Sequence, residues 1–261
     1  MQKISAVIIT YNEENFIEKC LQSVEGIADE IIVVDSFSTD STEEICKKYN
    51  VRFEKKSFAG FRDQKNYAIS LATNKYILAV DADEALSEKL RESIIKLKQN
   101  ISADGYLFNR LGNFCGQWIT HSGWYPDRQL RLFDKDKGSW GQFNVHEKVE
   151  LVHGSKIKKI KGDLLHWPCS SQTDYHDKIV KYSDIAAFEY HNADKKANIF
   201  TPYIHGGWRF ILNYFLRLGF LDGQNGFFIC STDSYYSYLK YKKLRKINRN
   251  GASNYDTYNG L

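Results

Sequence analysis

The stretch YILAVDADE at residues 76–84 decides how the rest of the chain is interpreted. Its first five residues are an apolar, β-prone run of the length of a buried strand, and Asp81, Asp83 and Glu84 follow directly. Carboxylates two residues apart, where a strand passes into a loop, can turn toward one divalent cation. Mg²⁺ and Mn²⁺ prefer oxygen ligands and often share them with substrate phosphates. The stretch predicts either such a metal site or a polar loop that caps a strand and opens the next helix.

The composition is that of a globular protein. The chain has 261 residues, of which 43% are hydrophobic, enough to bury a substantial core. A net charge of +4 gives no indication of nucleic-acid binding. The five cysteines show no CxxC spacing, so neither a zinc site nor a disulfide framework is predicted. We expect no signal peptide and no membrane-spanning helix, and therefore a cytoplasmic protein with reduced thiols.

Strand and helix patterns alternate over the first hundred residues. We expect strands at 4–10, 31–35, 51–54 and 76–80, and helices at 15–24, from 40 or 41 onward, and at 61–72. This alternation predicts an α/β fold with a mostly parallel sheet covered on both faces. Ligands of such sheets bind beyond the carboxyl ends of the strands, where polar clusters at 10–14, 35–40 and 81–84 should gather.

Several nucleotide-dependent classes lack their motifs here. Neither GxGxxG nor GxxxxGK[ST] occurs, which argues against a dinucleotide oxidoreductase or a P-loop NTPase. A nucleotidyltransferase should offer a glycine-rich first loop with a catalytic Arg or Lys, and ITYNEE at 9–14 offers neither. A phosphatase with a nucleophilic D-x-D needs that motif after the first strand, whereas here it follows the fourth. What remains is a nucleotide held by strand-end side chains, with a metal near its diphosphate.

Motifs along the chain resemble those of a known family. The first three, in order, are AVIITYNEE at 6–14, IIVVDSFSTDST at 31–42 and YILAVDADE at 76–84. Together they resemble the N-terminal half of family 2 glycosyltransferases of the GT-A fold. That resemblance implies a Rossmann-like, mostly parallel nucleotide-binding sheet, a smaller mixed sheet on the acceptor side, and C-terminal helices. Later stretches are RQLRLF at 128–133, VHE at 145–147, LLH at 164–166 and GFLDG at 219–223. These resemble a bacterial subgroup that includes lipopolysaccharide-core β-1,4-glucosyltransferases, so the resemblance spans nearly the whole chain.

The resemblance implies an inverting glycosyltransferase. It would move a hexose, with glucose favoured, from a nucleotide-diphosphate sugar, with a UDP-hexose favoured. The acceptor would be a lipid-linked or surface glycan in lipopolysaccharide or cell-envelope polysaccharide biosynthesis. The alternative is a catalytically inactive nucleotide-sugar-binding or membrane scaffold protein. Loss of Asp83 or Glu147 would favour that alternative, and both residues are present.

The resemblance places the nucleotide at the first two strand ends. Thr10, Tyr11 and Glu13 would line the base and ribose pocket, although Tyr11 also suits a simple turn that opens a helix. Asp35 ends the second strand. Many family members carry a further acidic residue next to it that contacts uracil, and this chain has Ser36 there. The departure leaves the identity of the base open.

The diphosphate and metal would lie between the third helix and the D-x-D motif. Arg62 and Lys65, one helical turn apart, can form a cationic clamp or a solvated helical face. The resemblance implies that Asp83 binds Mg²⁺ or Mn²⁺, that Asp81 contacts ribose or metal, and that His166 completes the metal shell. A core or surface histidine is the alternative for His166. The cation would stabilise the charge that grows on the departing nucleoside diphosphate.

An inverting transferase needs a general base for the acceptor hydroxyl. Glu147 is our candidate, with adjacent His146 as orienter or sugar contact, and a solvent-exposed strand edge is the alternative for this pair. Asp127 is the competing base. On the acceptor side, Trp124 can stack on sugar rings, and Arg128 or Arg131 can hold anionic groups of a glycan. The aromatic residues of this region can equally fill the core of a second small sheet.

The C-terminal part has a helical pattern. We expect a GT-A catalytic domain at 1–170 with a nucleotide-sugar half at 1–100 and an acceptor half at 101–170, a helical extension at 171–247, and a flexible tail at 248–261. The segment 208–221 is apolar but carries two Arg and one Asn, which suits a bilayer interface better than a span, and the basic run 240–249 can bind anionic lipids. Peripheral contact with the inner face of the cytoplasmic membrane would follow. A helix packed on the catalytic domain is the alternative.

Overall fold

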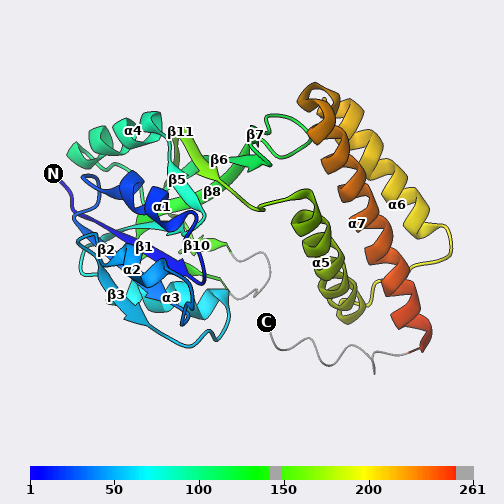
Figure 1. The fold of residues 1–261 in the computed structure, drawn as a ribbon, viewed down its shortest axis with the longest axis horizontal. Helices are drawn as coiled ribbons and strands as arrows, with labels where there is room; N and C mark the ends of the chain where they lie inside the picture. The colour runs from blue at the N-terminus through cyan, green and yellow to red at the C-terminus, as the bar shows by residue number, and fades with distance from the viewer. Residues whose placement is uncertain (142–147, 251–261) are drawn as a thin grey trace. The chain divides into compact units, whose positions relative to one another are not determined.

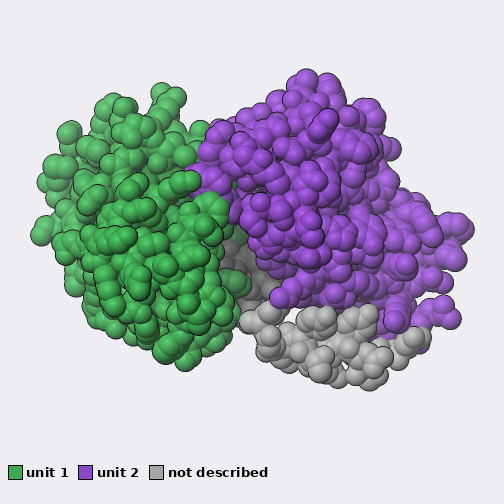
Figure 2. Space-filling view, viewed as in Figure 1, with its two compact units in different colours: residues 1–111, 127–166 green, residues 112–126, 167–261 purple. Residues whose placement is uncertain are grey.

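A computed structural model of the protein describes residues 1–141 and 148–250 (Figure 1). The chain divides into two compact units, shown in green and purple in Figure 2. Unit 1 comprises Met1–Leu111 and Asp127–His166, and unit 2 comprises Gly112–Pro126 and Trp167–Leu261. The short segment 112–126 therefore leaves the first unit and returns to it. Each unit has its own hydrophobic core.

Unit 1 begins with the expected alternation of strands and helices. Its first strands are β1 (Ile4–Thr10), β2 (Glu30–Asp35), β3 (Arg52–Lys55) and β4 (Tyr76–Asp81). The helices between them are α1 (Ile17–Val24), α2 (Thr42–Cys46) and α3 (Phe61–Leu71). All neighbouring pairs in the order β3-β2-β1-β4 are parallel. The alternation predicted from the sequence is confirmed.

The same sheet continues beyond β4 with strands from the second half of the unit. These are β8 (Asp127–Asp134), β6 (Gly105–Phe114), β11 (Ile157–His166) and β5 (Glu84–Leu86), in that spatial order. β8 is antiparallel to β4 and to β6, and β11 is antiparallel to β5. Helix α4 (Glu88–Gln99) follows β5, and β9 (Gly138–Trp140) and β10 (Val149–Leu151) form a separate antiparallel pair. The mixed strands expected in this half thus extend the parallel sheet, because β8 pairs with β4.

The sheet has a core on each face. On one face, buried Ile8 of β1 and Leu78 of β4 pack with Leu21 of α1 and Leu90 of α4. On the other face, the neighbours of those strand residues in sequence, Val7 and Ile77, pack with Ala68 of α3 and Trp140 of β9. Successive strand residues point to opposite faces, so two buried faces require the continuous apolar runs seen in β1 and β4.

Unit 2 consists mainly of helices. They are α5 (Gln172–Asn192), α6 (Thr201–Phe210), a π-helical segment (Ile211–Leu216), a 3₁₀ turn (Gly219–Asp222) and α7 (Gly223–Asn250). α7 packs against both α5 and α6 (Figure 1). The unit also holds the outer end of β6 and β7 (Gln117–Trp118), which pairs with it.

The apolar segment expected as one helix at 208–221 is divided in the structure. The helical path starts earlier, at Thr201, where Asn198 accepts hydrogen bonds from the backbone N–H groups of Phe200 and Thr201. It ends before Leu218, whose backbone is left-handed with φ of 56°. Among the described residues, no helix is long and apolar enough to cross a membrane. α7 extends through Asn250, and the rest of the tail expected at 248–261 lies outside the described residues.

Candidate functional site

The register of the parallel strands gathers polar side chains at one edge of the sheet. Thr10 of β1 pairs with Asp35 of β2, and Ile9 pairs with Asp81 of β4. The ends of these strands therefore lie side by side, as expected for parallel strands whose helices cover both faces. The last residues of these strands and the loops that follow them carry six of the eight residues predicted to bind a nucleotide sugar.

The loops after β1 and β2 are tied to each other. Asp35 is fully buried, and its carboxylate accepts hydrogen bonds from the backbone N–H of Ser38 at 2.9 Å and from the Ser38 hydroxyl. Asn12 has a left-handed backbone with φ of 54°, and its side-chain oxygen accepts from the backbone N–H of Thr39 at 2.8 Å. Asp35 thus shapes the loop at residues 36–40. The hydroxyl of Ser36 accepts a hydrogen bond from Gln64 at 3.1 Å.

Two aromatic side chains stand exposed on these loops. Tyr11 is 58% exposed and Phe37 is 53% exposed, and Phe37 has a left-handed backbone with φ of 64°. An exposed aromatic face can stack on a nucleotide base. Sequence reasoning missed Phe37, although a lone phenylalanine among Ser, Thr and Asp residues was a usable signal. The backbone N–H of Glu13 donates to the Thr42 hydroxyl at 2.9 Å, so Glu13 connects the loop after β1 to the first residue of α2.

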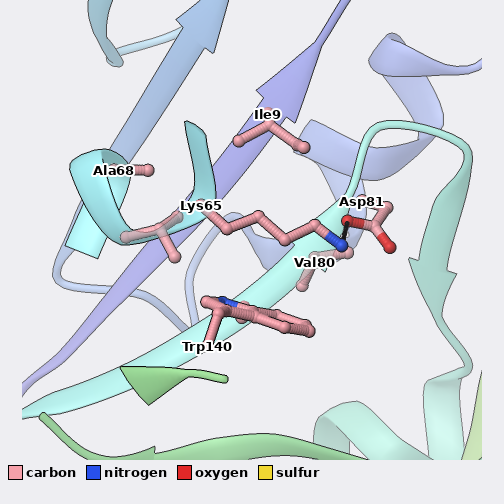
Figure 3. A pocket seen from close by; sticks show the side chains of 8 residues that line it. Ile9, Lys65, Ala68, Val80, Asp81 and Trp140 are labelled. Atoms are coloured by element: carbon pink, nitrogen blue, oxygen red, sulfur yellow. Dashed lines mark ion pairs between the residues drawn. The ribbon is translucent and has the colours of Figure 1, made fainter. Parts of the chain in front are cut away.

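Asp81 lies between two cations. Its Oδ1 is 2.9 Å from Lys65 Nζ, and its Oδ2 is 2.9 Å from Arg131 Nη2. Figure 3 shows Lys65 reaching from α3 to Asp81 above the ring of Trp140, whose centroid is 4.3 Å from Lys65 Nζ. Burial opposes the charge of the carboxylate, but Lys65 and Arg131 outweigh it and hold the pKa of Asp81 well below its usual range. Asp81 is therefore a carboxylate whose two oxygens are both engaged.

Trp140 is held in place under this ion pair. Its backbone N–H donates to Asn66 Oδ1 at 3.0 Å, and its carbonyl accepts from Asn66 Nδ2 at 3.1 Å. These two hydrogen bonds connect β9 to α3 at Asn66, the residue that follows Lys65. A small cavity beside the ring is lined by Lys65, Asp81 and apolar residues of β1, α3 and β4 (Figure 3).

A second carboxylate extends the network behind Asp81. Glu84 is 1% exposed, and its Oε1 lies 2.7 Å from Arg131 Nη2 and 3.3 Å from Arg110 Nη1. Its Oε2 accepts a hydrogen bond from the backbone N–H of Asp81 at 3.1 Å, which closes the loop between β4 and β5. Burial opposes the charge of the Arg131 guanidinium, but Glu84 and Asp81 outweigh it and raise its pKa. Sequence reasoning assigned no role to Glu84 or Arg110.

Arg131 and Asp127, both on β8, take part in ion pairs that the sequence did not indicate. Arg131 was expected to hold an acceptor, but it is 2% exposed and contacts Asp81 and Glu84. Asp127, the competing base, is held by Arg110 through Nε at 2.8 Å and Nη2 at 2.7 Å, and by Gln129 at 2.8 Å. Both residues therefore take part in ion pairs within unit 1.

Asp83 and His166 meet at the end of the D-x-D loop. Asp83 Oδ2 is 3.4 Å from His166 Nε2, and both side chains are partly exposed. The pairing of β11 with β5 places His166 opposite Glu84, one residue after Asp83. Among the described residues, no group of three or more His, Cys, Asp and Glu side chains could hold a metal ion. One carboxylate and one imidazole nevertheless fit a cation that takes its other ligands from phosphate and water.

The remaining predicted residues are dispersed or lie outside the described residues. Arg62 pairs with its neighbour Asp63 at 2.7 Å, whereas Lys65 on the same helix reaches Asp81. Arg128 is exposed on β8. Trp124 belongs to unit 2, where its ring lies 5.9 Å from that of Phe114. His146 and Glu147 fall within residues 142–147, outside the described residues.

Buried polar atoms without a partner occur around β4. Among the described residues they are Thr10 Oγ1, Gln64 Oε1, Arg131 Nε, Arg131 Nη1 and Trp140 Nε1. Each such atom costs stability unless a ligand or water satisfies it. Their elements, β1, α3, β8 and β9, are the ones that meet around Asp81. These atoms can each form a hydrogen bond with a polar ligand or with water.

The sequence matches a known family over more than half of its length. The family model described as glycosyl transferase family 2 matches residues 5–150. The chain belongs to this family. It is 31% identical over 257 residues to the lipopolysaccharide core biosynthesis glycosyltransferase LpsC of Rhizobium meliloti, covering 92% of this chain and 91% of that protein. It is 30% identical over 257 residues to an uncharacterized glycosyltransferase of Rickettsia typhi, covering 95% and 88%.

Among solved structures, S. aureus TarS 1–349 is similar with a TM-score of 0.46 and 17% identity, covering 96% of this chain and 92% of that one. The expected enzyme class, a family 2 glycosyltransferase, is confirmed by the family match and the relatives. The expected α/β fold of the GT-A type is likewise confirmed, with a parallel half-sheet, mixed strands beside it and C-terminal helices.

Replacing Arg131 should destabilise this glycosyltransferase strongly. Arg131→Met leaves Asp81 and Glu84 without their shared cation, and breaking a buried ion pair costs roughly 3–5 kcal/mol of unfolding free energy. Arg128→Met, on the same strand but exposed, is the matched control and should change stability by less than about 0.5 kcal/mol. Urea unfolding followed by circular dichroism measures both. Equal stabilities of the two variants would contradict the structural role of Arg131.

The ion pairs of Asp81 should make stability depend on acid pH. Because the folded-state pKa of Asp81 is lowered, its contribution is complete above the unfolded pKa of about 3.9 and is lost as pH falls below it. Below about pH 4, the native protein should therefore lose up to about 1.4 kcal/mol per pH unit more than Asp81→Asn. Unfolding free energies of both proteins between pH 5 and about pH 3 test this difference. Parallel curves would show that Asp81 does not titrate as the ion pairs require.

Proposed function

We propose that this family 2 enzyme is an inverting hexosyltransferase of cell-envelope biosynthesis. It moves a hexose, with glucose favoured, from a nucleotide-diphosphate sugar, with UDP favoured, to a lipid-linked or surface-glycan acceptor. The relative LpsC, named for lipopolysaccharide core biosynthesis, supports the envelope role because the match covers nearly all of both chains. The observation that supports the proposed donor site is the 3.4 Å contact between Asp83 and His166, next to the ion-paired Asp81.

In this proposal the donor nucleotide lies across the ends of β1 and β2. Tyr11 and Phe37 offer exposed rings to the base, and the unpartnered hydroxyl of Thr10 offers a hydrogen bond. Asp35 acts by holding the loop at residues 36–40 in shape. Ser36 presents a hydroxyl where related enzymes carry a second acid, so the base is recognised through neutral groups and stacking.

Asp83 and His166 are the proposed metal ligands. A bound Mg²⁺ or Mn²⁺ would supply positive charge that stabilises the departing diphosphate. Lys65 and Arg131 hold Asp81, and Glu84 holds the backbone N–H of Asp81, so the D-x-D loop is preorganised before any ligand binds. Arg62, one turn before Lys65, can leave Asp63 to contact the donor diphosphate.

Glu147 remains our proposed general base. A base there takes the proton of the acceptor hydroxyl as its oxygen attacks the anomeric carbon from the face opposite the leaving group. The tight pairing of Asp127 with Arg110 and Gln129 supports Glu147, because a carboxylate already engaged by three hydrogen bonds has less capacity to accept that proton. His146, Trp124 and Arg128 are proposed acceptor contacts.

The proposed division of labour follows the chain. Residues 1–100 bind the donor, residues 101–170 supply the acceptor side, and residues 171–247 form a helical extension that brings the enzyme to the inner face of the cytoplasmic membrane. Lipid-linked acceptors are found at such a surface. The apolar and charged surface of that extension, described below, supports this placement.

Removing Asp83 should abolish metal-dependent donor binding. With UDP-glucose at about one hundred times its dissociation constant, Mn²⁺-dependent binding stabilises the folded enzyme by about 2.7 kcal/mol. Asp83→Asn should lose this stabilisation and keep the melting temperature of the ligand-free protein. Glu92→Gln, which changes an exposed carboxylate on α4, is the control and should keep it.

A thermal-shift panel of UDP, UDP-glucose and other nucleoside diphosphates, with and without Mn²⁺, makes the measurement. A full Mn²⁺-dependent shift in Asp83→Asn would remove Asp83 from the metal site. A shift with another nucleotide in place of UDP would change the proposed donor and leave the site intact.

Replacing Glu147 should separate binding from transfer. Glu147→Gln should keep the donor-induced thermal shift and lower the transfer rate about 10²- to 10⁴-fold, as expected for loss of a general base. Asp127→Asn is the competing variant and should retain more activity than Glu147→Gln. Release of UDP in the presence of acceptor reports the rate. A fully active Glu147→Gln enzyme would place the base elsewhere.

A further inference from the structure

One side of the helical path from α6 into the π-helical segment is apolar and exposed. Its side chains, here called the apolar face, are Phe200, Tyr203, Ile204, Trp208, Ile211 and Phe215. Phe200, Ile204, Trp208, Ile211 and Phe215 are spaced by three or four residues, and Tyr203 lies three residues after Phe200, so all six lie along one side of the path. Each is between 45% and 68% exposed, which is unusual for six large apolar side chains on one side of a helix.

The opposite side of the same path is what holds it in the unit. Pro202, Gly206 and Asn213 are buried there. A Cβ on Gly206 would lie 3.2 Å from Tyr238 Cβ, and the Gly206 carbonyl accepts a hydrogen bond from Ser234 of α7 at 2.8 Å. This close packing fixes the rotation of α6. The apolar face therefore points away from α7 except at Tyr203, whose ring lies 5.3 Å from that of Tyr238 of α7.

The apolar face continues into the turn that follows. Leu216, Leu218, Phe220 and Leu221 are each between 44% and 63% exposed, and Phe227 at the start of α7 is 54% exposed. The ring of Tyr214 connects these groups, with centroids 5.2 Å from Phe215, 6.2 Å from Phe220 and 5.7 Å from Phe227. The exposed apolar surface is thus continuous from the helix into its turn.

The charge of this region is strongly one-sided. Residues 195–250 contain ten Lys and Arg but only two acidic residues, Asp222 and Asp233, whereas the whole chain has a net charge of +4. Both acids are engaged inside the unit. Asp222 is 3% exposed and accepts from the Ser122 hydroxyl at 2.9 Å, and Asp233 accepts from the Tyr175 hydroxyl at 2.7 Å. Lys240 is 9% exposed and Lys243 pairs with Asp184 of α5 at 2.8 Å, whereas Lys195, Lys196 and Arg217 are exposed. Exposed positive charge therefore flanks the apolar face at both ends.

We propose that the apolar face docks on a lipid bilayer that contains anionic headgroups. Apolar side chains enter the boundary between headgroups and acyl chains, and the basic side chains pair with lipid phosphates. Trp208 and Tyr203 suit the headgroup level because each ring is apolar with one polar atom. Lys195 and Lys196 just before the face, and Arg217 just after it, can extend to the headgroups.

A second copy of the chain is the weaker occupant. Pairing two such faces would bring two regions of strong positive charge together, and like charges in contact oppose association. An anionic bilayer neutralises the same charges. The docking surface deepens the proposed membrane placement, but its test uses neither donor nor acceptor, so its outcome is independent of the proposed transfer.

Vesicle flotation of the full chain tests the proposal. The protein should float with phosphatidylcholine vesicles that contain phosphatidylglycerol, and less with phosphatidylcholine alone or at high salt. The triple variant Phe200→Ser, Ile204→Ser and Trp208→Ser should reduce the vesicle-bound fraction about tenfold or more, because buried apolar area drives interfacial binding. These exposed positions tolerate serine without loss of core packing, and an unchanged melting temperature verifies the fold.

The matched control replaces exposed apolar residues of unit 1. The variant Ile95→Ser, Val152→Ser and Ile157→Ser removes side chains that are 41%, 57% and 48% exposed and should float like the native protein. Native protein that stays unbound, or equal flotation of the two triple variants, would overturn the proposal. So would a dimer in sedimentation velocity that the α6 variant alone loses, because the occupant would then be a second copy.

Discussion

The ion pairs around Asp81 are the interaction on which the rest of unit 1 depends. Asp81 ends a parallel strand, and its carboxylate is shared between Lys65 of α3 and Arg131 of β8. Arg131 in turn pairs with Glu84, the first residue of β5. The buried guanidinium of Arg131 thus connects the parallel half of the sheet to β5, the strand that follows the D-x-D loop. Burying these charges is costly unless each has its partner, so loss of one partner leaves an uncompensated charge inside the protein.

The network also determines which carboxylate is available to a ligand. Asp81 and Glu84 are occupied by Lys65 and Arg131, and Asp127 is occupied by Arg110. Asp83, two residues after Asp81, points instead to His166. Asp83 lies in the two-residue turn between β4 and β5, which gives it a different environment from Asp81 and Glu84 at the strand ends. A motif with three acidic residues in four positions is thereby divided into structural acids and one proposed metal ligand.

In unit 2, helix packing determines which apolar side chains are exposed. Asp222 and Asp233 satisfy backbone and side-chain donors inside the unit, while Lys195, Lys196 and Arg217 are exposed. Close packing at Gly206 fixes which side of α6 is buried. The exposed apolar side is therefore a consequence of helix packing. Exposure of this apolar side to water is unfavourable, and contact with a lipid surface would remove it from water.

Local patterns in the sequence determined the strands and helices of the first hundred residues, because buried strands such as β1 and β4 need continuous apolar runs and their helices need one apolar side. The order of the three motifs determined the family. The tertiary structure alone decided the partners of Arg131, Glu84 and Arg110, because side chains far apart in sequence meet only after β8 pairs with β4 and with β6. It also decided that α6 buries Gly206 and exposes Trp208, since the sequence of 199–221 is apolar on nearly every side and packing against α7 selects which side stays in contact with solvent.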